Sequence, residues 1–231
     1  MDKIFKVIDS ILDYDKRNKL LKHFSCNYDK DISEDAFELY EYLRYFYPNI
    51  SYFHGLTRMA IIIPDCKYII KVPFRGVYKE NKFFKFEKNY CEQEYRNYDE
   101  LSSGGLEKFF AETTCLSLNG YTFELQEKCL PWKEFQHNVS KTDMEKAIKL
   151  KKKFITFNAD INLPYVFIAE LIKVYGENEV KNLFTEAAFY NPDLLKDMNI
   201  ENFGFRVSDG TPCIFDFSSF EKNDLIEKEE E

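Results

Sequence analysis

The sequence predicts an α+β fold in which a small antiparallel β-sheet with one inserted helix is followed by a mainly helical part and preceded by N-terminal helices. Helical spacing of apolar residues dominates positions 1–50, and short strand-like runs separated by turn residues dominate positions 51–130. After Pro131 the spacing is helical again, and one short hairpin pattern follows near the C-terminus. These observations divide the chain at about residues 50 and 130.

Length, composition and charge bound the classes of protein to which the chain can belong. With 231 residues, 45% hydrophobic and 31% charged, it can bury one core or two smaller parts that share a cleft. The net charge of -8 argues against a general nucleic-acid binder, which needs a basic stripe to neutralise phosphates. We interpret the lysine-rich run at 146–153 as the solvated face of a helix and the acidic residues 227–231 as a frayed tail.

The cysteines and the lack of long apolar runs favour a cytoplasmic protein. The 6 cysteines include no C-x-x-C pair, and several lie in apolar strand-like runs, which is typical of reduced, packed thiols. No run approaches the ~18 apolar residues of a membrane span, and no His/Cys cluster has the spacing of a structural zinc site. We therefore expect no membrane partner and no structural zinc.

Residues 1–50 are expected to form an N-terminal helical extension. A first run places its apolar residues on one helical face, namely Ile4, Val7, Ile8, Ile11 and Leu12. A second run, after a polar start at 33–35, does the same with Phe37, Leu39, Tyr40, Leu43 and Phe46.

Residues 51–130 are expected to form a hairpin, a helix and a second hairpin. Strand patterns at 59–63 and 68–72 flank a Pro-Asp-Cys-Lys turn. A helical pattern over 86–101 ends at the Ser-Ser-Gly-Gly stop signal of 102–105. Strand patterns at 111–118 and 121–127 are joined by the Asn119-Gly120 turn, the strongest short hairpin signal in the chain.

Residues 131–231 are expected to be mainly helical. The helical pattern covers about 141–157 and 164–189 and stops before Asn191-Pro192. A polar loop around Asp197 follows, and then a hairpin that turns at 208–210. Its return strand ends at Asp216.

Two segments far apart in the sequence carry the functional signal. Lys71 ends the apolar run Tyr-Ile-Ile-Lys, and Asp197 precedes Asn202 by five residues before the strand Ile-Phe-Asp-Phe that contains Asp216. With the hairpin, helix and hairpin between them, this order resembles the protein-kinase-like fold over about residues 51–220. The resemblance implies a bilobal architecture, with an N-lobe at 51–130 and a reduced helical C-lobe at 131–231.

The resemblance further implies that Lys71 holds nucleotide phosphates and pairs with a carboxylate of the inserted helix. Glu94 is the expected partner, because neighbours at spacings of three, four and seven place it on the inward face. Glu92 points roughly the opposite way, and Glu87 is the second choice. The structural alternatives are a lysine that extends to solvent and a solvated glutamate on a charged helix.

The loop that covers the phosphates and the hinge between the lobes are less distinctive. In place of the family's G-x-G-x-x-G loop, residues 53–60 contain one glycine, Gly55, and its backbone with the side chains of Thr57 and Arg58 is expected to contact phosphates. An ordinary turn is the alternative for Gly55. The strand that runs into residues 127–129 resembles the hinge, where the backbone of Glu127 and Cys129 is expected to contact adenine.

The catalytic and metal-binding roles fall on the C-terminal segment. Asp197 and Asn202 match the family's D-x-x-x-x-N spacing, which implies a catalytic base and a Mg²⁺ ligand. The His-Arg that usually precedes the Asp is replaced by Leu195-Lys196. Asp216 resembles the Asp of D-F-G with serine in place of glycine, and it is expected to bind Mg²⁺ with Asn202. A polar loop and a turn-capping Asp are the alternatives.

The resemblance therefore implies an atypical kinase that transfers the γ-phosphoryl group of ATP, with Mg²⁺, to a hydroxyl of a protein or a small molecule. Only 15 residues follow Asp216 (231 - 216), so a truncated C-lobe is expected, as in some bacterial effector kinases. A cytoplasmic location is expected, and for a bacterial effector or a phage kinase this can be the cytoplasm of the host cell. The alternatives are a non-catalytic kinase-like module that binds a partner protein, and a small-molecule phosphotransferase.

Overall fold

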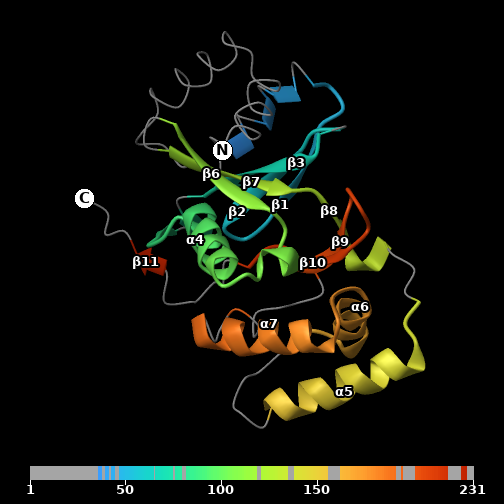
Figure 1. The fold of residues 1–231 in the computed structure, drawn as a ribbon. Helices are drawn as coiled ribbons and strands as arrows, with labels where there is room; N and C mark the ends of the chain where they lie inside the picture. The colour runs from blue at the N-terminus through green and yellow to red at the C-terminus, as the bar shows by residue number, and fades with distance from the viewer. Residues whose placement is uncertain are drawn as a thin grey trace.

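The computed structural model describes residues 36–37, 40–41, 43–44, 47–64, 66–74, 76–79, 82–118, 121–134, 138–155, 162–190, 194, 201–217 and 225–227. Antiparallel strands and helices confirm the α+β class (Figure 1). The run expected at 4–12, the turn at 119–120 and most of the tail at 227–231 lie outside the described residues. In the second N-terminal run, Tyr40 and Leu43 are buried as expected, whereas Phe37 is 37% exposed.

A five-stranded antiparallel sheet forms the first part of the fold. Its order is β1-β2-β3-β7-β6, made of β1 (Ser51–His54), β2 (Arg58–Ile62), β3 (Tyr68–Pro73), β7 (Tyr121–Glu127) and β6 (Thr113–Leu118). The two predicted hairpins are thereby confirmed, and β3 and β7 bring them together in the middle of the sheet. The sequence did not predict β1, whose side chains are all exposed, because an edge strand without a buried face lacks the alternating pattern.

The inserted helix α4 (Tyr90–Ser103) begins four residues later than the sequence predicted. Asn89 caps it, because its side-chain oxygen accepts hydrogen bonds from the backbone N–H groups of Cys91 and Glu92. Phe86 belongs instead to a strand. The helix end near Gly104 agrees with the predicted stop signal.

A second, three-stranded sheet was missed by the sequence analysis. It has the order β11-β5-β4 and consists of β4 (Gly76–Lys79), β5 (Lys82–Phe86) and β11 (Leu225–Glu227). Glu227, which was assigned to a frayed tail, pairs with Phe84. The pairing of β11 with β5 is long-range, and no local pattern in so short a strand indicates its partner.

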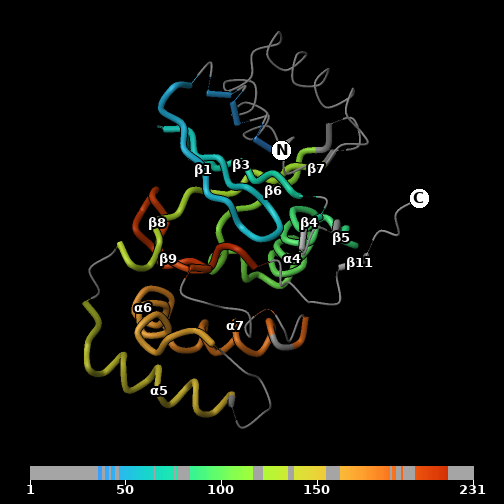
Figure 2. Tube along the Cα trace, turned by 180° about the vertical axis from the view of Figure 1, so that it is seen from behind, coloured from blue at the N-terminus to red at the C-terminus, as the bar shows by residue number. Residues whose placement is uncertain are grey.

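From Cys129 to Phe217, the described residues form a short sheet and three α-helices. The sheet has the order β10-β9-β8, from β8 (Cys129–Pro131), β9 (Phe203–Arg206) and β10 (Pro212–Ile214), and it contains the hairpin predicted to turn at 208–210. The helices are α5 (Lys141–Ile155), α6 (Tyr165–Tyr175) and α7 (Glu177–Tyr190). They lie on the side of this short sheet that faces away from the five-stranded sheet (Figures 1 and 2).

The helical pattern at 164–189 forms two helices instead of one. Gly176 ends α6 with φ at 89°, in the left-handed region that favours glycine. The apolar spacing continues through the break because both helices bury a face in the same cluster, which includes Ile168, Ile172, Val180 and Leu183. Periodicity therefore concealed a turn that the single glycine marks.

The buried hydrophobic residues form two clusters. One lies at the five-stranded sheet and includes Leu43, Met59, Ile61, Val72 and Phe123. The other joins α5, α6, α7, the β9–β10 hairpin and the end of α4, and is rich in aromatic side chains such as Trp132, Phe167, Phe184, Phe203 and Phe217. The helix α4 contributes to both clusters, through Tyr90 and Leu101 respectively.

Arg206 on β9 connects these parts through hydrogen bonds from all of its guanidinium N–H groups. The side chain is 11% exposed and pairs with Glu127 at 3.0 Å. It donates to the backbone oxygens of Lys108 and Phe110 at 2.9 and 2.7 Å, and to the Tyr175 hydroxyl at 3.1 Å. One buried side chain thus joins β7, the connection after α4, and α6.

The cysteine and membrane predictions can be compared with the described residues. Cys66, Cys91, Cys115, Cys129 and Cys213 are all free thiols. Among the described helices, none combines the length and the apolar composition that crossing a bilayer requires. The lysine-rich run lies in α5, where Lys152 and Lys153 are exposed as a solvated face predicts.

Candidate functional site

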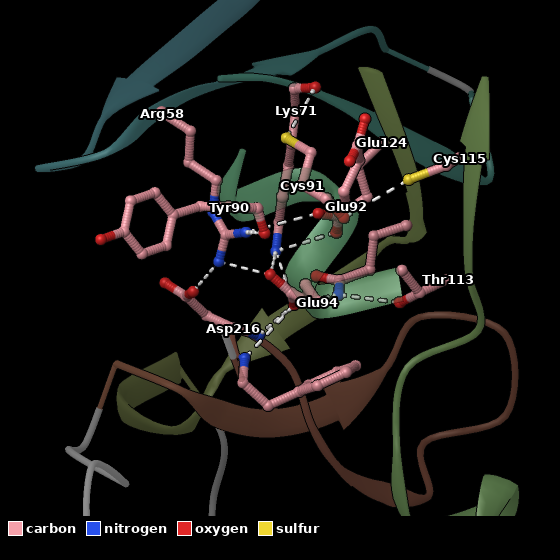
Figure 3. A network of polar contacts seen from close by, with 12 residues as sticks. Arg58, Lys71, Tyr90, Cys91, Glu92, Glu94, Thr113, Cys115, Glu124 and Asp216 are labelled. Atoms are coloured by element: carbon pink, nitrogen blue, oxygen red, sulfur yellow. Dashed lines mark hydrogen bonds and ion pairs between the residues drawn. The ribbon is translucent and has the colours of Figure 1, made fainter. Parts of the chain in front are cut away.

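The face of the five-stranded sheet beneath α4 carries charged side chains on three neighbouring strands. Arg58, Lys71 and Glu124 come from β2, β3 and β7 and are 5%, 4% and 0% exposed. Lys71 lies opposite Ala60 of β2 and opposite Glu124 of β7. Arg58 is two residues from Ala60 on the same strand, so the side chains of Arg58, Lys71 and Glu124 share one face of the sheet. Figure 3 shows them converging on Glu94 and Asp216.

Lys71 and Glu94 form a buried ion pair. The Nζ atom of Lys71 donates to both carboxylate oxygens of Glu94, at 2.9 and 3.0 Å, and Glu94 is fully buried. The other two candidates of the helix region lie elsewhere: Glu87 is exposed, and Glu92 accepts a hydrogen bond from the Thr122 hydroxyl at 2.7 Å. The structure thus joins the strand lysine to the inward-facing glutamate.

Glu94 also holds the backbone of the segment that contains Asp216. Its Oε1 accepts from the backbone N–H groups of Asp216 and Phe217 at 3.0 and 3.3 Å, and from Nε2 of Gln126 at 2.7 Å. One turn further along α4, Asn97 donates to the carbonyl of Phe217 at 2.8 Å. Glu94 and Asn97, on one face of α4, therefore hold the backbone of Asp216 and Phe217 through its N–H groups and a carbonyl.

Asp216 has an unusual backbone and a half-exposed side chain. Its φ is 61°, in the left-handed region that non-glycine residues enter at a cost of about 1–3 kcal/mol, although Asp tolerates it better than most. Its side chain is 48% exposed, and its carboxylate pairs with the guanidinium of Arg58. Burial of the carboxyl group opposes ionisation, but the charges of Arg58 and Lys71 outweigh it and lower the pKa of Asp216.

Arg58 lies among carboxylates, whereas the sequence predicted it on a loop that contacts phosphates. Its Nη2 pairs with both Glu94 and Asp216, and its Nη1 donates to Glu124 at 3.3 Å and to the carbonyl of Tyr90 at 3.2 Å. Burial disfavours the charged form, but Asp216, Glu94 and Glu124 outweigh this effect and raise the pKa of Arg58. Its guanidinium is therefore charged and bound within the protein.

The residues around Arg58 form a tight turn. The N–H of Gly55 donates to the carbonyl of Arg58 at 2.9 Å, and a Cβ at Gly55 would lie 3.0 Å from that oxygen. Thr57 is 7% exposed, and its carbonyl accepts from the N–H of Phe74 at 2.8 Å. The structure accounts for Gly55 by the close approach of the turn, which is the alternative that the sequence left open.

Glu124 is a functional candidate that the sequence analysis missed. It is fully buried, with Oε1 3.2 Å from Nζ of Lys71 and Oε2 3.3 Å from Nη1 of Arg58. Desolvation and the charge of Glu94 raise its pKa to about 8, against the opposing effect of Lys71 and Arg58. In β7, Thr122, Glu124 and Gln126 alternate with Phe123 and Leu125, which indicates one polar face, but a polar face is ordinarily assigned to solvent.

The predicted metal ligands lie on adjacent backbone segments. Asn202 is 7% exposed, and its carbonyl accepts from the N–H of Phe215 at 2.8 Å, which brings it next to the residue before Asp216. Within the described part of the chain, no group of three or more His, Cys, Asp or Glu residues has the arrangement of a metal site. Asp197, the predicted catalytic base, lies outside the described residues.

The predicted hinge at 127–129 is held by hydrogen bonds within the protein. The N–H of Glu127 donates to the carbonyl of Glu112, and that of Lys128 donates to the carbonyl of Lys67, both at 2.8 Å. Cys129 begins β8, and its Sγ lies 3.2 Å from that of Cys213 on β10. An adenine contact through the N–H of Glu127 is therefore not compatible with this arrangement.

No family model matches the chain, and no curated protein matches it. Among solved structures, the Helicobacter pylori proinflammatory kinase CtkA is 19% identical with a TM-score of 0.34, over 73% of this chain and 55% of that one. The ADP-bound aminoglycoside phosphotransferase APH(2'')-Ib is 14% identical with a TM-score of 0.31, over 81% and 70% of the two chains. This chain thus spans about half the length of the first.

Proposed function

We propose that this protein is an ATP- and Mg²⁺-dependent phosphotransferase with a bilobal, kinase-like architecture, in which residues 51–130 form the N-lobe and 131–231 a reduced C-lobe. The observation that carries the proposal is the buried Lys71–Glu94 pair, whose carboxylate also binds the backbone of Asp216. A lysine held in this way presents a fixed positive charge beside the half-exposed carboxylate. Phosphoryl transfer depends on such prearranged charges more than on covalent chemistry.

The residues divide into three proposed roles. Lys71, positioned by Glu94, would bind the α- and β-phosphates, and adenine would lie against the connector at 127–129 through contacts other than the N–H groups of Glu127 and Lys128, which bond to Glu112 and Lys67. Asp197 would orient the acceptor hydroxyl and take its proton. The backbone of the turn between β1 and β2, at Gly55, would face the phosphates, whereas the side chains of Thr57 and Arg58 are buried behind it. The acceptor is a hydroxyl of a protein or a small molecule.

The donor set near Asp216 fits a magnesium ion in its chemistry. Mg²⁺ prefers carboxylate and amide oxygens and retains several waters, which requires access to solvent. Asp216 supplies a carboxylate that is 48% exposed, and Asn202 supplies an amide one residue before β9. When bound there, the metal would neutralise the charge on the phosphates.

Nucleotide binding and phosphoryl transfer test the proposal at two levels. Saturation with ATP and Mg²⁺ at about 100 times Kd should stabilise the protein by about 2.7 kcal/mol, seen as a rise in Tm. Incubation with γ-labelled ATP should label the protein itself or an added acceptor. Asp216→Asn should abolish transfer, and Glu92→Gln is the matched control because Glu92 bonds to Thr122 away from the cluster. Transfer that survives Asp216→Asn contradicts the metal assignment.

One observation favours a second function, that of a non-catalytic nucleotide-binding or partner-binding module. The carboxylate proposed to hold the metal is already paired with Arg58. If this pairing is permanent, nucleotide can bind without being hydrolysed or transferred. A Tm rise with ATP that does not depend on Mg²⁺, together with no labelled product, would support this function over the first.

A further inference from the structure

The positive charges of Arg58 and Lys71 are surrounded by three carboxyl groups, those of Glu94, Glu124 and Asp216. Glu94 and Glu124 are both fully buried, whereas the side chain of Asp216 is 48% exposed. Asp216 is therefore the carboxylate of this cluster that a solute ion can reach. The Arg58 side chain, at 6% exposure, approaches it from the protein side.

The carboxylates hold Arg58 in different ways. Its Nη2 is shared between Glu94 and Asp216, and its Nη1 is shared between Glu124 and the Tyr90 carbonyl. Loss of Asp216 as a partner would leave the guanidinium bound on its other sides. The pair with Asp216 is open to solvent on the Asp216 side, whereas the contacts of Arg58 with Glu94 and Glu124 are buried and cannot be exchanged for water.

We propose that Arg58 is a built-in counter-ion of Asp216 that a divalent metal ion must displace, and that Glu124 retains Arg58 in the site when this happens. The inference rests on the proposed function, since it takes Asp216 as the metal ligand. It adds a form of regulation: without metal, the charge of the Asp216 carboxylate is neutralised by a side chain of the same chain. Metal entry exchanges one cation on the Asp216 carboxylate for another.

The charges of the cluster explain why Glu124 is needed. Once Asp216 turns to a metal ion, Arg58 and Lys71 are two cations that face Glu94. Two like charges at close range in a buried site repel strongly. The carboxyl group of Glu124 has Oε1 3.2 Å from Nζ of Lys71 and Oε2 3.3 Å from Nη1 of Arg58, so once it releases its proton it supplies the second negative charge. Arg58 and Glu124 should therefore affect metal binding in opposite directions.

The test is titration of the full chain with Mn²⁺, followed through the electron paramagnetic resonance signal of the free ion, without nucleotide and again with ADP. Arg58→Gln should tighten binding by about tenfold, which corresponds to about 1.4 kcal/mol. Glu124→Gln should weaken it, and Glu92→Gln should leave it unchanged. Urea unfolding of each variant establishes that it is folded.

The outcomes separate the inference from the proposed function. If Mn²⁺ binds equally well to Asp216→Asn, or to no variant, the metal assignment is wrong and the proposed function fails with it. If binding depends on Asp216 but Arg58→Gln does not strengthen it, only the counter-ion inference is overturned. If Arg58→Gln does not fold, Arg58→Lys replaces it. A lysine cannot bridge Asp216 and Glu94 through a planar fork, so an intermediate gain in affinity is expected and an unchanged affinity overturns the inference.

Discussion

Glu94 and Asp216 are two carboxylates of one cluster, but their surroundings differ. Glu94 is fully buried and accepts hydrogen bonds from Lys71, Gln126 and two backbone N–H groups. Asp216 is half exposed, and its side chain pairs with Arg58. One carboxylate thus binds several buried groups of the cluster, while the other has a side that solvent can reach.

The largest expected effect comes from removing the buried carboxylate. Glu94→Ala removes the acceptor of the N–H groups of Asp216 and Phe217 and leaves Lys71 and Arg58 with one carboxylate fewer between them. The free energy of unfolding should fall by about 3–5 kcal/mol, because buried charges lose their partner. Urea denaturation measures this, with the exposed Glu100→Ala as the control on the same helix. A loss below about 1 kcal/mol would mean that Glu94 is not the anchor.

A pH dependence from Glu124 is the second effect. Burial and Glu94 raise its folded-state pKa to about 8, while the unfolded chain titrates at the ordinary value near 4.5, so between these values the folded chain retains a proton that the unfolded chain has lost. Stability should therefore fall as pH rises from about 5 to 8, by about 2–4 kcal/mol.

The groups that face Glu124 define the control for this experiment. They are Lys71 on β3, Arg58 on β2, Cys115 on β6, and Glu94 and Cys91 on α4. Unfolding by urea at several pH values should show a flatter profile in Glu124→Gln than in the native protein. Equal slopes in both proteins would assign the pH dependence to another group.

Asn97→Ala should have a smaller effect. It removes the hydrogen bond to the buried carbonyl of Phe217 and leaves that oxygen without this partner. A cost of about 1–3 kcal/mol is expected. Because Asn97 holds the segment that Glu94 also binds, the double variant Glu94→Ala/Asn97→Ala should lose less than the sum of the single variants. Additive losses in urea denaturation would show that the two contacts act independently.

The smallest expected change in stability is that of Asp216→Asn. The ion pair with Arg58 is half exposed and therefore screened, and Asn also tolerates the left-handed backbone at this position. Stability should change by less than about 1 kcal/mol while metal binding is lost. Thermal unfolding with and without Mn²⁺ checks both parts, and a large loss without metal would make Asp216 an anchor like Glu94.

The parts of the site that the sequence predicted depend on local signals. Lys71 and Asp216 were assigned by their place in the order of elements that resembles the kinase-like fold, and helical spacing selected Glu94 as the inward-facing glutamate of the inserted helix. Their proximity was expected from the order of hairpin, helix and hairpin, and the structure confirms this order.

The parts that were missed depend on which surface covers which. The polar residues on β7 are consistent with a solvent-exposed face unless α4 is known to cover them. Arg58 was assigned to a loop because its partners Glu94, Glu124 and Asp216 lie 36, 66 and 158 residues away in the sequence. The strand β11 likewise pairs with β5 at long range. Sequence periodicity describes one element at a time, so contacts between distant elements do not appear in it.

The guanidinium of Arg206 has a consequence for how the protein unfolds. Since it binds β7, the connection after α4, and α6 at once, the five-stranded sheet cannot separate from the helices without leaving several buried donors unpaired. Unfolding of either the sheet or the helices would therefore break hydrogen bonds of Arg206 that also hold the other part. The two hydrophobic clusters are expected to unfold as one cooperative unit, and the relative positions of Lys71 and Asp216 persist up to the global transition.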